Sequence, residues 1–469
     1  MNLKNNAIVF LFSRGWQYAG RCRPLLVVYI IMFALAKGIE LTEPYVIGRM
    51  LNDIQVDLGG GLGNTNKILS DVGRYLLLLG AISLGLWAMH GPARIIEQFV
   101  AFQIRSNFKS DLFRRLTCLP MRWQREHHSG ESIDKINNAT AAMSAFFQTT
   151  FWLVYMAVRI TGTLAILFCL MPIAGWAAVF TTVLAIMTIA LFDKVLGEQL
   201  CELNRKDNLV ASAIHDYASN ITSVITLRLE KRTFDEVRRR VFSSQRLFTK
   251  NAALTELKWA IISLQVTAVT LIVMFLYVHS NLSARHLILA GTFFTLFEYM
   301  RSLGVFYDAF ANIYGTIDRQ AAALRSVDTI NEAYNASDLT ESNADLSRSW
   351  KEIEVRNLNF TYEDEKCKSH HLNDLCIKLE RGKSIAIVGE SGSGKSTLLS
   401  VLRGLQKPES VEVTADGVKL PQDLRHLSHS TTLLPQDPEI FADTIRFNIS
   451  FGVEADDDEL MSVLQLSKF

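Results

Sequence analysis

A lysine and a serine that follow a glycine-rich run are the residues of this chain best suited to chemistry. The run from Gly389 to Ser396 reads Gly-Glu-Ser-Gly-Ser-Gly-Lys-Ser, which fits G-x-x-x-x-G-K-[ST] at every fixed position. Glycines let the backbone turn its N–H groups towards phosphate oxygens, the Lys395 ammonium would contact the β- and γ-phosphates, and the Ser396 hydroxyl would be a ligand of Mg²⁺. The alternative is a Gly/Ser loop that carries a lysine by chance. The pattern predicts a site for ATP and Mg²⁺ formed by Gly389, Ser391, Gly392, Ser393, Gly394, Lys395, Ser396 and Thr397.

The segments on both sides of this run support a nucleotide site. Residues 383–388 (KSIAIV) form a short apolar run that predicts a β-strand, and residues 396–405 (STLLSVLRGL) have helical spacing. A strand, a glycine loop and a helix N-terminus in this order form an anion-binding arrangement. We expect an α/β P-loop domain over residues 351–469.

The composition indicates that most of the chain belongs to a different kind of domain. Of the 469 residues 49% are hydrophobic, and the excess lies before about residue 330. The net charge of +1 does not favour an anionic partner, and we predict no nucleic-acid binding. Six scattered cysteines without a C-x-x-C pair indicate neither a disulfide framework nor a zinc site. The first residues lack a convincing cleavage site, so no removable signal peptide is predicted.

Apolar segments long enough to cross about 30 Å of hydrocarbon occur six times before the nucleotide site. They predict an all-α membrane domain over residues 1–332, followed by a polar linker over 333–350. The predicted spans are residues 24–47, 75–99, 151–171, 173–192, 259–278 and 287–310.

Lysine and arginine are concentrated in two of the connections between these spans. The connections within 105–135 and 194–250 are rich in both residues, and the other three are short or nearly free of them. Because basic loops stay on the cytoplasmic side, both long connections, the N-terminus and the nucleotide domain are expected in the cytoplasm.

Several spans carry charges that lipid would not tolerate unpaired. These residues are Lys37, Glu40 and Glu43 in the first span, Arg159 in the third, and Glu298 and Arg301 in the sixth. Lys37 with Glu40, and Glu298 with Arg301, are three residues apart and could pair on one helical face. Ionisable groups inside a membrane either line a pathway or form structural pairs and reach to an interface, and both interpretations stay open here.

Six spans, two long basic loops and a phosphate-binding domain resemble an ABC (ATP-binding cassette) exporter half-transporter. The segments LPMRWQREHHSGESIDKINNAT and AIHDYASNITSVITLRLEKR are similar to the two coupling regions of this family. The resemblance implies that each carries a short helix that docks on the nucleotide domains.

The resemblance also assigns two residues outside the glycine loop. In IEVRNLNFTYEDE, Tyr362 corresponds to the aromatic residue that stacks on adenine, although a buried strand tyrosine is the alternative. The segment LLPQDPEIFADTIRFNI is similar to the family's Q-loop, with Gln436 as the glutamine that helps to order Mg²⁺ and water. We therefore assign Gln436 a catalytic and metal-binding role.

The family's cassette continues beyond residue 469. Residues 1–469 contain no Leu-Ser-Gly-Gly-Gln signature, no apolar strand ending in Asp-Glu after the Q-loop and no later switch histidine. We expect a fragment of a half-transporter that ends within the helical subdomain.

The resemblance implies a subunit that couples ATP binding and hydrolysis to export of an unidentified substrate by alternating access. It would pair with a second half-transporter, as a homodimer or heterodimer, in a bacterial inner (plasma) membrane. The alternative is a truncated, non-hydrolysing or inert membrane subunit that binds ATP weakly or not at all. A six-span channel or receptor with an ATP-sensing domain is disfavoured by the coupling regions.

Overall fold

The computed structural model describes residues 6–59, 65–127, 129–336, 346, 349–362, 369–434, 436 and 440–467. The chain forms two compact units. The first consists of residues 1–116 and 130–332, and the second of residues 117–129 and 333–469. The division near residue 332 agrees with the predicted end of the membrane domain, but residues 117–129 belong to the second unit.

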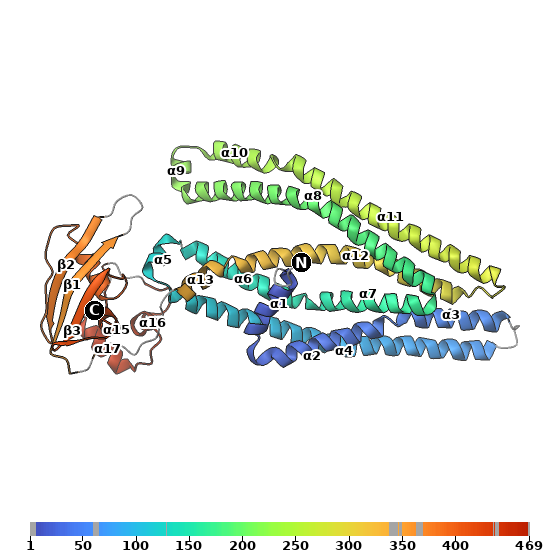
Figure 1. Cartoon of the computed structure of the whole chain (residues 1–469), viewed down its shortest axis with the longest axis horizontal. Helices are drawn as coiled ribbons and strands as arrows, with labels where there is room; N and C mark the ends of the chain where they lie inside the picture. Colours follow the sequence, from blue (N-terminus) through green and yellow to red (C-terminus); the bar gives the residue numbers. More distant parts are fainter. Residues whose placement is uncertain are drawn as a thin grey trace. The chain divides into compact units, whose positions relative to one another are not determined.

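The first unit is helical, and its long helices lie side by side (Figure 1). Among them, α8 packs along α11 and α3 packs along α12. The helices that begin in this unit or lead into it are α1 (Ala7–Tyr18), α2 (Arg23–Glu40), α3 (Glu43–Gly59), α4 (Thr65–Thr117), α6 (Ser129–Gln148), α7 (Thr150–Leu170), α8 (Pro172–Ser219), α9 (Ile221–Thr226), α10 (Glu230–Phe242), α11 (Gln245–Ser283), α12 (Ala290–Arg325) and α13 (Asp328–Ala336).

Five helical segments of the described chain are long and apolar enough to cross a membrane. They are Gly20–Gly59, Thr65–Thr117, Gly130–Leu170, Pro172–Ser219 and Glu230–Ser283. The sixth predicted span falls in α12, which is not among the five and carries Glu298 and Arg301 within its apolar stretch. Many apolar side chains on the five segments point outwards; Leu77 and Leu84 of α4, for example, are about three-quarters exposed, at 77% and 76%. Outward apolar surface of this kind suits contact with lipid.

The first predicted span is two helices rather than one. Helix α2 ends at Glu40 and α3 begins at Glu43, with Pro44 as its second residue. Proline has no N–H to donate and is tolerated in the first turn of a helix, so one helix ends before Pro44 and the next begins beside it. The carbonyl of Leu41 at the break accepts a hydrogen bond from the Tyr299 hydroxyl of α12 at 2.7 Å.

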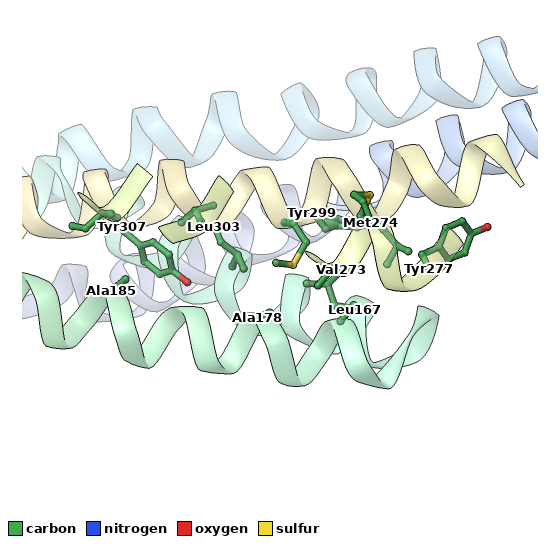
Figure 2. Close-up of a cluster of buried hydrophobic side chains, with 14 of the residues drawn as sticks. Leu167, Ala178, Ala185, Val273, Met274, Tyr277, Tyr299, Leu303 and Tyr307 are labelled. Atoms are coloured by element: carbon green, nitrogen blue, oxygen red, sulfur yellow. The ribbon is translucent and has the colours of Figure 1, made fainter. Parts of the chain in front are cut away.

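A buried apolar cluster joins α7, α8, α11 and α12 (Figure 2). Ala178 and Ala185 are small enough for α8 to approach its neighbours closely, while Tyr299 and Tyr307 of α12 fill the space between helices. The Tyr307 hydroxyl lies 2.8 Å from the Thr182 hydroxyl of α8, which satisfies a buried polar group. The aromatic run of α12 thus contributes to helix packing.

The second unit contains a four-stranded antiparallel sheet with the order β2-β1-β3-β4. Val355 of β1 lies opposite Ile377 of β2 and Val413 of β3, so the central strand supplies the core of the sheet. Its elements are α5 (Met121–Glu126), β1 (Glu352–Tyr362), β2 (Ser369–Glu380), α14 (Lys395–Leu402), β3 (Ser410–Ala415), β4 (Val418–Lys419), α15 (Leu424–Ser430), α16 (Ile445–Ser450) and α17 (Asp457–Leu466).

The prediction of a strand before the glycine loop is wrong. Residues 383–390 belong to no strand, and Ile385, Ile387 and Val388 are 54%, 41% and 88% exposed. A strand exists only where its backbone pairs with a neighbour, and no described strand runs beside this segment. The apolar run was recognised, but it pairs with no strand among the described residues.

Candidate functional site

The glycine loop connects an extended segment to the first turn of α14. Gly392 and Gly394 have φ angles of +87° and +90°, in the left-handed region that side chains disfavour. A Cβ atom on Gly389 would lie 2.8 Å from the Ser393 hydroxyl oxygen, so a side chain at Gly389 would collide with the loop. The backbone therefore favours glycine at Gly392 and Gly394, and a side chain at Gly389 would displace the Ser393 hydroxyl.

Lys395 points into the loop that precedes it. Its ammonium group donates to the carbonyl oxygens of Gly389 at 2.9 Å and Glu390 at 2.7 Å, and lies 3.3 Å from the Ser393 hydroxyl. These oxygens are weak, neutral acceptors that phosphate oxygens could replace with stronger, charge-assisted bonds. The loop and the lysine therefore fit a phosphate chain.

Helix α14 holds this loop against the core of the second unit. Gly394 is its N-cap residue, and Leu398 and Val401 are buried in the cluster that includes Val355 and Val413. Because α14 is packed against this core, the N–H groups of its first turn are held in place and can bind an anion. Ser396 and Thr397 lie in this first turn.

The two residues assigned by resemblance lie apart in the chain from this loop. Tyr362 ends β1, where its backbone pairs with Ser369, and its side chain is outside the described set. Gln436 lies in an exposed bend. The structure places Tyr362 at the end of β1 and Gln436 between α15 and α16, and the binding roles of both stay predictions.

The segment after Gln436 is held by an asparagine. Asn448 of α16 accepts a hydrogen bond from the N–H of Phe441 at 2.8 Å and donates to the Phe441 carbonyl at 3.0 Å. Thr444 caps α16 by accepting from the N–H of Phe447 at 3.1 Å. The spacing F-x-x-T-I-x-x-N from Phe441 to Asn448 therefore fixes the local turn.

Each segment that resembles a coupling region contains a short helix. Met121–Glu126 forms α5, where the Trp123 and His127 rings stack with centroids 4.1 Å apart. Ile221–Thr226 forms α9, and Ile221, Ile225 and Leu227 expose more than half of their surfaces there. The short helices implied by the resemblance are present.

The charged residues of the spans form the pairs that their spacing predicts. Lys37 bonds Glu40, and Arg301 donates to Glu298 at 2.7 Å. A cavity of about 360 Å³ lies in the first unit beside the break between α2 and α3. Its lining residues are Lys37, Glu40, Leu41, Glu43, Pro44, Ile47, Tyr155, Arg159, Phe294, Glu298, Tyr299 and Ser302.

The sequence reasoning missed a further buried charge. Glu97 of α4 is fully buried, forms an ion pair with Arg94 and accepts a hydrogen bond from the N–H of Phe151 at 3.0 Å. Arg94 also donates to the Gln148 carbonyl at 3.0 Å. Together they hold the break between α6 and α7. The three-residue spacing of Arg94 and Glu97 could have revealed this pair, as it revealed the Lys37–Glu40 and Glu298–Arg301 pairs.

Comparisons with known proteins agree with these two regions. The family model described as ABC transporter transmembrane region matches residues 26–303, and the model described as ABC transporter matches residues 372–469. An ATP-dependent lipid A-core flippase of Chromobacterium violaceum is 22% identical over 460 residues, which cover 94% of this chain and 75% of that protein. ABC transporter B family member 21 of Arabidopsis thaliana is 34% identical over 163 residues, or 34% of this chain and 12% of that protein.

The fold has a solved counterpart. A bacterial Atm1-family ABC exporter with ATP bound superimposes with a TM-score of 0.73 at 19% identity, covering 95% of this chain and 77% of that chain. The helical region and the nucleotide-domain region thus share the fold of that solved chain. Since the transmembrane model alone matches more than half of the chain, this multi-pass membrane protein belongs to the ABC transporter family.

Proposed function

We propose that this chain is the subunit of an exporter that couples ATP binding and hydrolysis to the passage of a substrate across a membrane. The observation that carries the proposal is Lys395, held by its own glycine loop at the start of α14 in a chain with a matching transmembrane region. Members of the ABC transporter family are ATPases, which supports the hydrolytic part of the proposal.

Lys395 would bind the β- and γ-phosphates of ATP. Its ammonium group would exchange the Gly389 and Glu390 carbonyls for phosphate oxygens, while the loop N–H groups contact the remaining oxygens. Tyr362 would stack on the adenine. Ser396 and Gln436 would hold Mg²⁺, which neutralises charge on the phosphates, and Gln436 would also orient water.

The short helices α5 and α9 would transmit the movement of the nucleotide domains to the spans. The exposed Ile221, Ile225 and Leu227 give α9 an apolar surface at the tip of a long basic loop. Such a surface is suited to docking on a nucleotide domain when two subunits assemble. Switching between inward-open and outward-open states would follow from this contact.

The relatives support a location and a form of assembly. Several are bacterial lipid A-core flippases by name, so we propose a bacterial inner membrane and leave the cargo to experiment. The basic connections favour a cytoplasmic location for the N-terminus and the nucleotide domain. One membrane region and one nucleotide domain imply a dimer with a second half-transporter.

The test is ATP binding and turnover by the protein purified in detergent from its own gene, with its intact mass measured. Lys395→Ala should abolish binding of a fluorescent ATP analogue and lower vanadate-sensitive ATPase activity by roughly 100-fold. Lys378→Ala is the matched control, because that ammonium group pairs with Glu352 on the sheet. It should leave both measurements unchanged.

Two outcomes would contradict the proposal. If the wild type binds the analogue without vanadate-sensitive turnover, the chain is the non-hydrolysing subunit of the alternative hypothesis. If Lys395→Ala and Lys378→Ala have equal effects, the glycine loop is not the nucleotide site.

A further inference from the structure

The turn between α1 and α2 places two arginines where the first predicted span begins. This turn is η2 (Gly20–Cys22), a single turn of 3₁₀ helix that carries Arg21, and Arg23 is the first residue of α2. Helix α4 holds the turn, because the Asn107 amide donates to the Tyr18 carbonyl at 2.8 Å. Both arginines therefore belong to helical structure at the edge of an apolar span.

Arg23 is oriented by its contacts and is not neutralised by them. Its Nε atom donates to the Trp16 carbonyl at 3.0 Å, and its guanidinium carbon lies 5.7 Å from the centroid of the Trp16 ring. Neither contact brings a negative charge, and the terminal nitrogens of the guanidinium group can still donate. Arg21 is exposed and forms no ion pair or hydrogen bond with the part of the chain that the structure describes. The pair thus presents two positive charges without a carboxylate partner in that part of the chain.

Other cations at or within the apolar segments do have partners. Lys258 donates to the Asp193 carboxylate at 2.9 Å just before the fifth predicted span. Lys37 and Arg159 lie 4.7 Å and 5.4 Å from the centroid of the Tyr155 ring, and each also approaches a carboxylate of α2. Arg21 and Arg23 differ from these cations, so their charge is available to a ligand.

The two arginines stand at the end of an apolar face of α2. One side of this helix packs inwards, where Leu26, Tyr29 and Phe33 are buried. The opposite side leaves five apolar side chains between 37% and 55% exposed, and these are Leu25, Val27, Val28, Ile31 and Leu35. Because residues three and four apart share a helical face, this surface runs along the helix from the arginines into the hydrocarbon region. Positive charge followed by exposed apolar surface matches the two parts of a phospholipid.

We propose that Arg21 and Arg23 bind the phosphate of an anionic phospholipid, whose acyl chains lie along the exposed face of α2. Guanidinium groups suit phosphate oxygens because they donate paired hydrogen bonds between charged partners. Trp16 fits the same setting, since its ring has an apolar body and a polar N–H, and such rings favour the boundary between lipid and water. A free phosphate ion would use the arginines alone and leave the apolar face of α2 without a partner.

This lipid site is independent of the nucleotide loop. Arg21 and Arg23 belong to the first unit, and Lys395 belongs to the second. Helix α1 runs across the long helices in Figure 1, as a helix that lies on a membrane surface would. A bound lipid would anchor the α1–α2 turn at that surface whether or not the chain hydrolyses ATP.

The test is native mass spectrometry of the full chain in detergent, titrated with dioleoyl phosphatidylglycerol or dioleoyl phosphatidylcholine. Both lipids have the same acyl chains and a phosphate group, but only phosphatidylglycerol carries a net negative charge. The wild type should bind its first phosphatidylglycerol more than about tenfold more tightly than its first phosphatidylcholine. Inorganic phosphate at the same concentration should not displace phosphatidylglycerol, because it has no acyl chains.

Arg21→Gln is the variant that disturbs the fold least, because Arg21 makes no hydrogen bond or ion pair with the described residues. It should raise the Kd of phosphatidylglycerol about fivefold. The double variant Arg21→Gln/Arg23→Gln should bind the two lipids equally. The matched control is Arg246→Gln/Lys250→Gln, which removes the same charge from exposed positions near the start of α11. Its Kd should equal that of the wild type.

Equal binding of both lipids by the wild type, or equal losses in the arginine variants and the α11 control, would overturn the proposal. Displacement of phosphatidylglycerol by inorganic phosphate would overturn the lipid and leave a site for the phosphate group alone. A wild type that prefers phosphatidylglycerol but has no ATPase activity would contradict the proposed ATP-driven function and not the lipid site.

Discussion

Tyr18 connects the N-terminal helix to α4. Its hydroxyl donates to the Asp111 carboxylate at 3.0 Å, and its carbonyl accepts from the Asn107 amide at 2.8 Å. Burial, followed by the negative charge and hydrogen bond of Asp111, raises the pKa of Tyr18 to about 12. Because the folded state keeps this proton at a pH where the unfolded chain loses it, folding and titration are linked.

The stability of the first unit should therefore fall as the pH rises from about 10 to about 12. Below pH 10 the phenol is protonated in both states, and Tyr18 contributes no pH dependence. Tyr18→Phe should cost about 1 kcal/mol at neutral pH, because the hydrogen bond is lost, and should lose less stability above pH 10. The measurement is thermal unfolding followed by intrinsic fluorescence across this pH range. If the unfolding midpoints of the wild type and Tyr18→Phe changed in parallel with pH, the link between folding and titration would be contradicted.

Charge spacing predicted residue pairs better than it predicted their surroundings. The pairs Lys37–Glu40 and Glu298–Arg301 are local on one helix, so three-residue spacing was enough to find them. The contact of Arg159 with Glu40 joins two helices that are distant in sequence, and spacing contains no information about it. For the same reason Tyr155 was not recognised as the ring between two cations.

Two glycines allow α3 and α12 to touch backbone to backbone. A Cβ atom on Gly291 would lie 1.8 Å from the carbonyl oxygen of Gly48. Hydrogen bonds follow the same seam: Asn52 accepts from the N–H of Thr292 at 3.1 Å, and Gln55 donates to the Ile288 carbonyl at 2.8 Å. Close approach is therefore reinforced by polar contacts on both sides.

Gly291→Ala should destabilise the helical unit by about 2 kcal/mol or more, because the added methyl group meets rigid backbone. Gly80→Ala is the matched control, since a Cβ atom there has no neighbour within 4 Å. It should be neutral or stabilise α4 by about 0.5–1 kcal/mol. Midpoints of thermal unfolding in detergent distinguish the two variants, and equal midpoints would show that the seam is loose.

At the scale of elements, the sequence predicted long apolar helices well and their interruptions poorly. Apolar length identified five segments that the structure also gives, but Pro44 was not recognised as the end of one helix and the start of the next. The apolar run before the glycine loop was taken for a strand, although pairing depends on a neighbour that local sequence cannot supply. Local patterns therefore predict where helices lie and cannot predict what pairs with a strand.

For the whole molecule, the proposed orientation makes a chemical prediction. Cys201 is exposed on α8 within the longer basic connection, and Ala284 is exposed after α11 in a connection with little basic charge. These two positions should therefore face opposite sides of the membrane.

A membrane-impermeant maleimide should label Ala284→Cys in intact cells and label Cys201 only after permeabilisation. Each protein carries a single cysteine, with the remaining native cysteines replaced by serine. Labelling is measured as the mass increase of the purified chain. Equal labelling of both positions from outside would contradict the proposed topology.

The interruption of the first span at Leu41 and Thr42 separates two helices that pack on different neighbours. Beyond it, α3 is locked to α12 by Gly48 and Gly291, so neither can slide without the other. Before it, α2 packs on α7. The hydrogen bond from the Tyr299 hydroxyl to the Leu41 carbonyl ties this junction to α12. A change in the angle between α2 and α3 would alter the charged cavity, because Glu40 ends α2 and Glu43 begins α3.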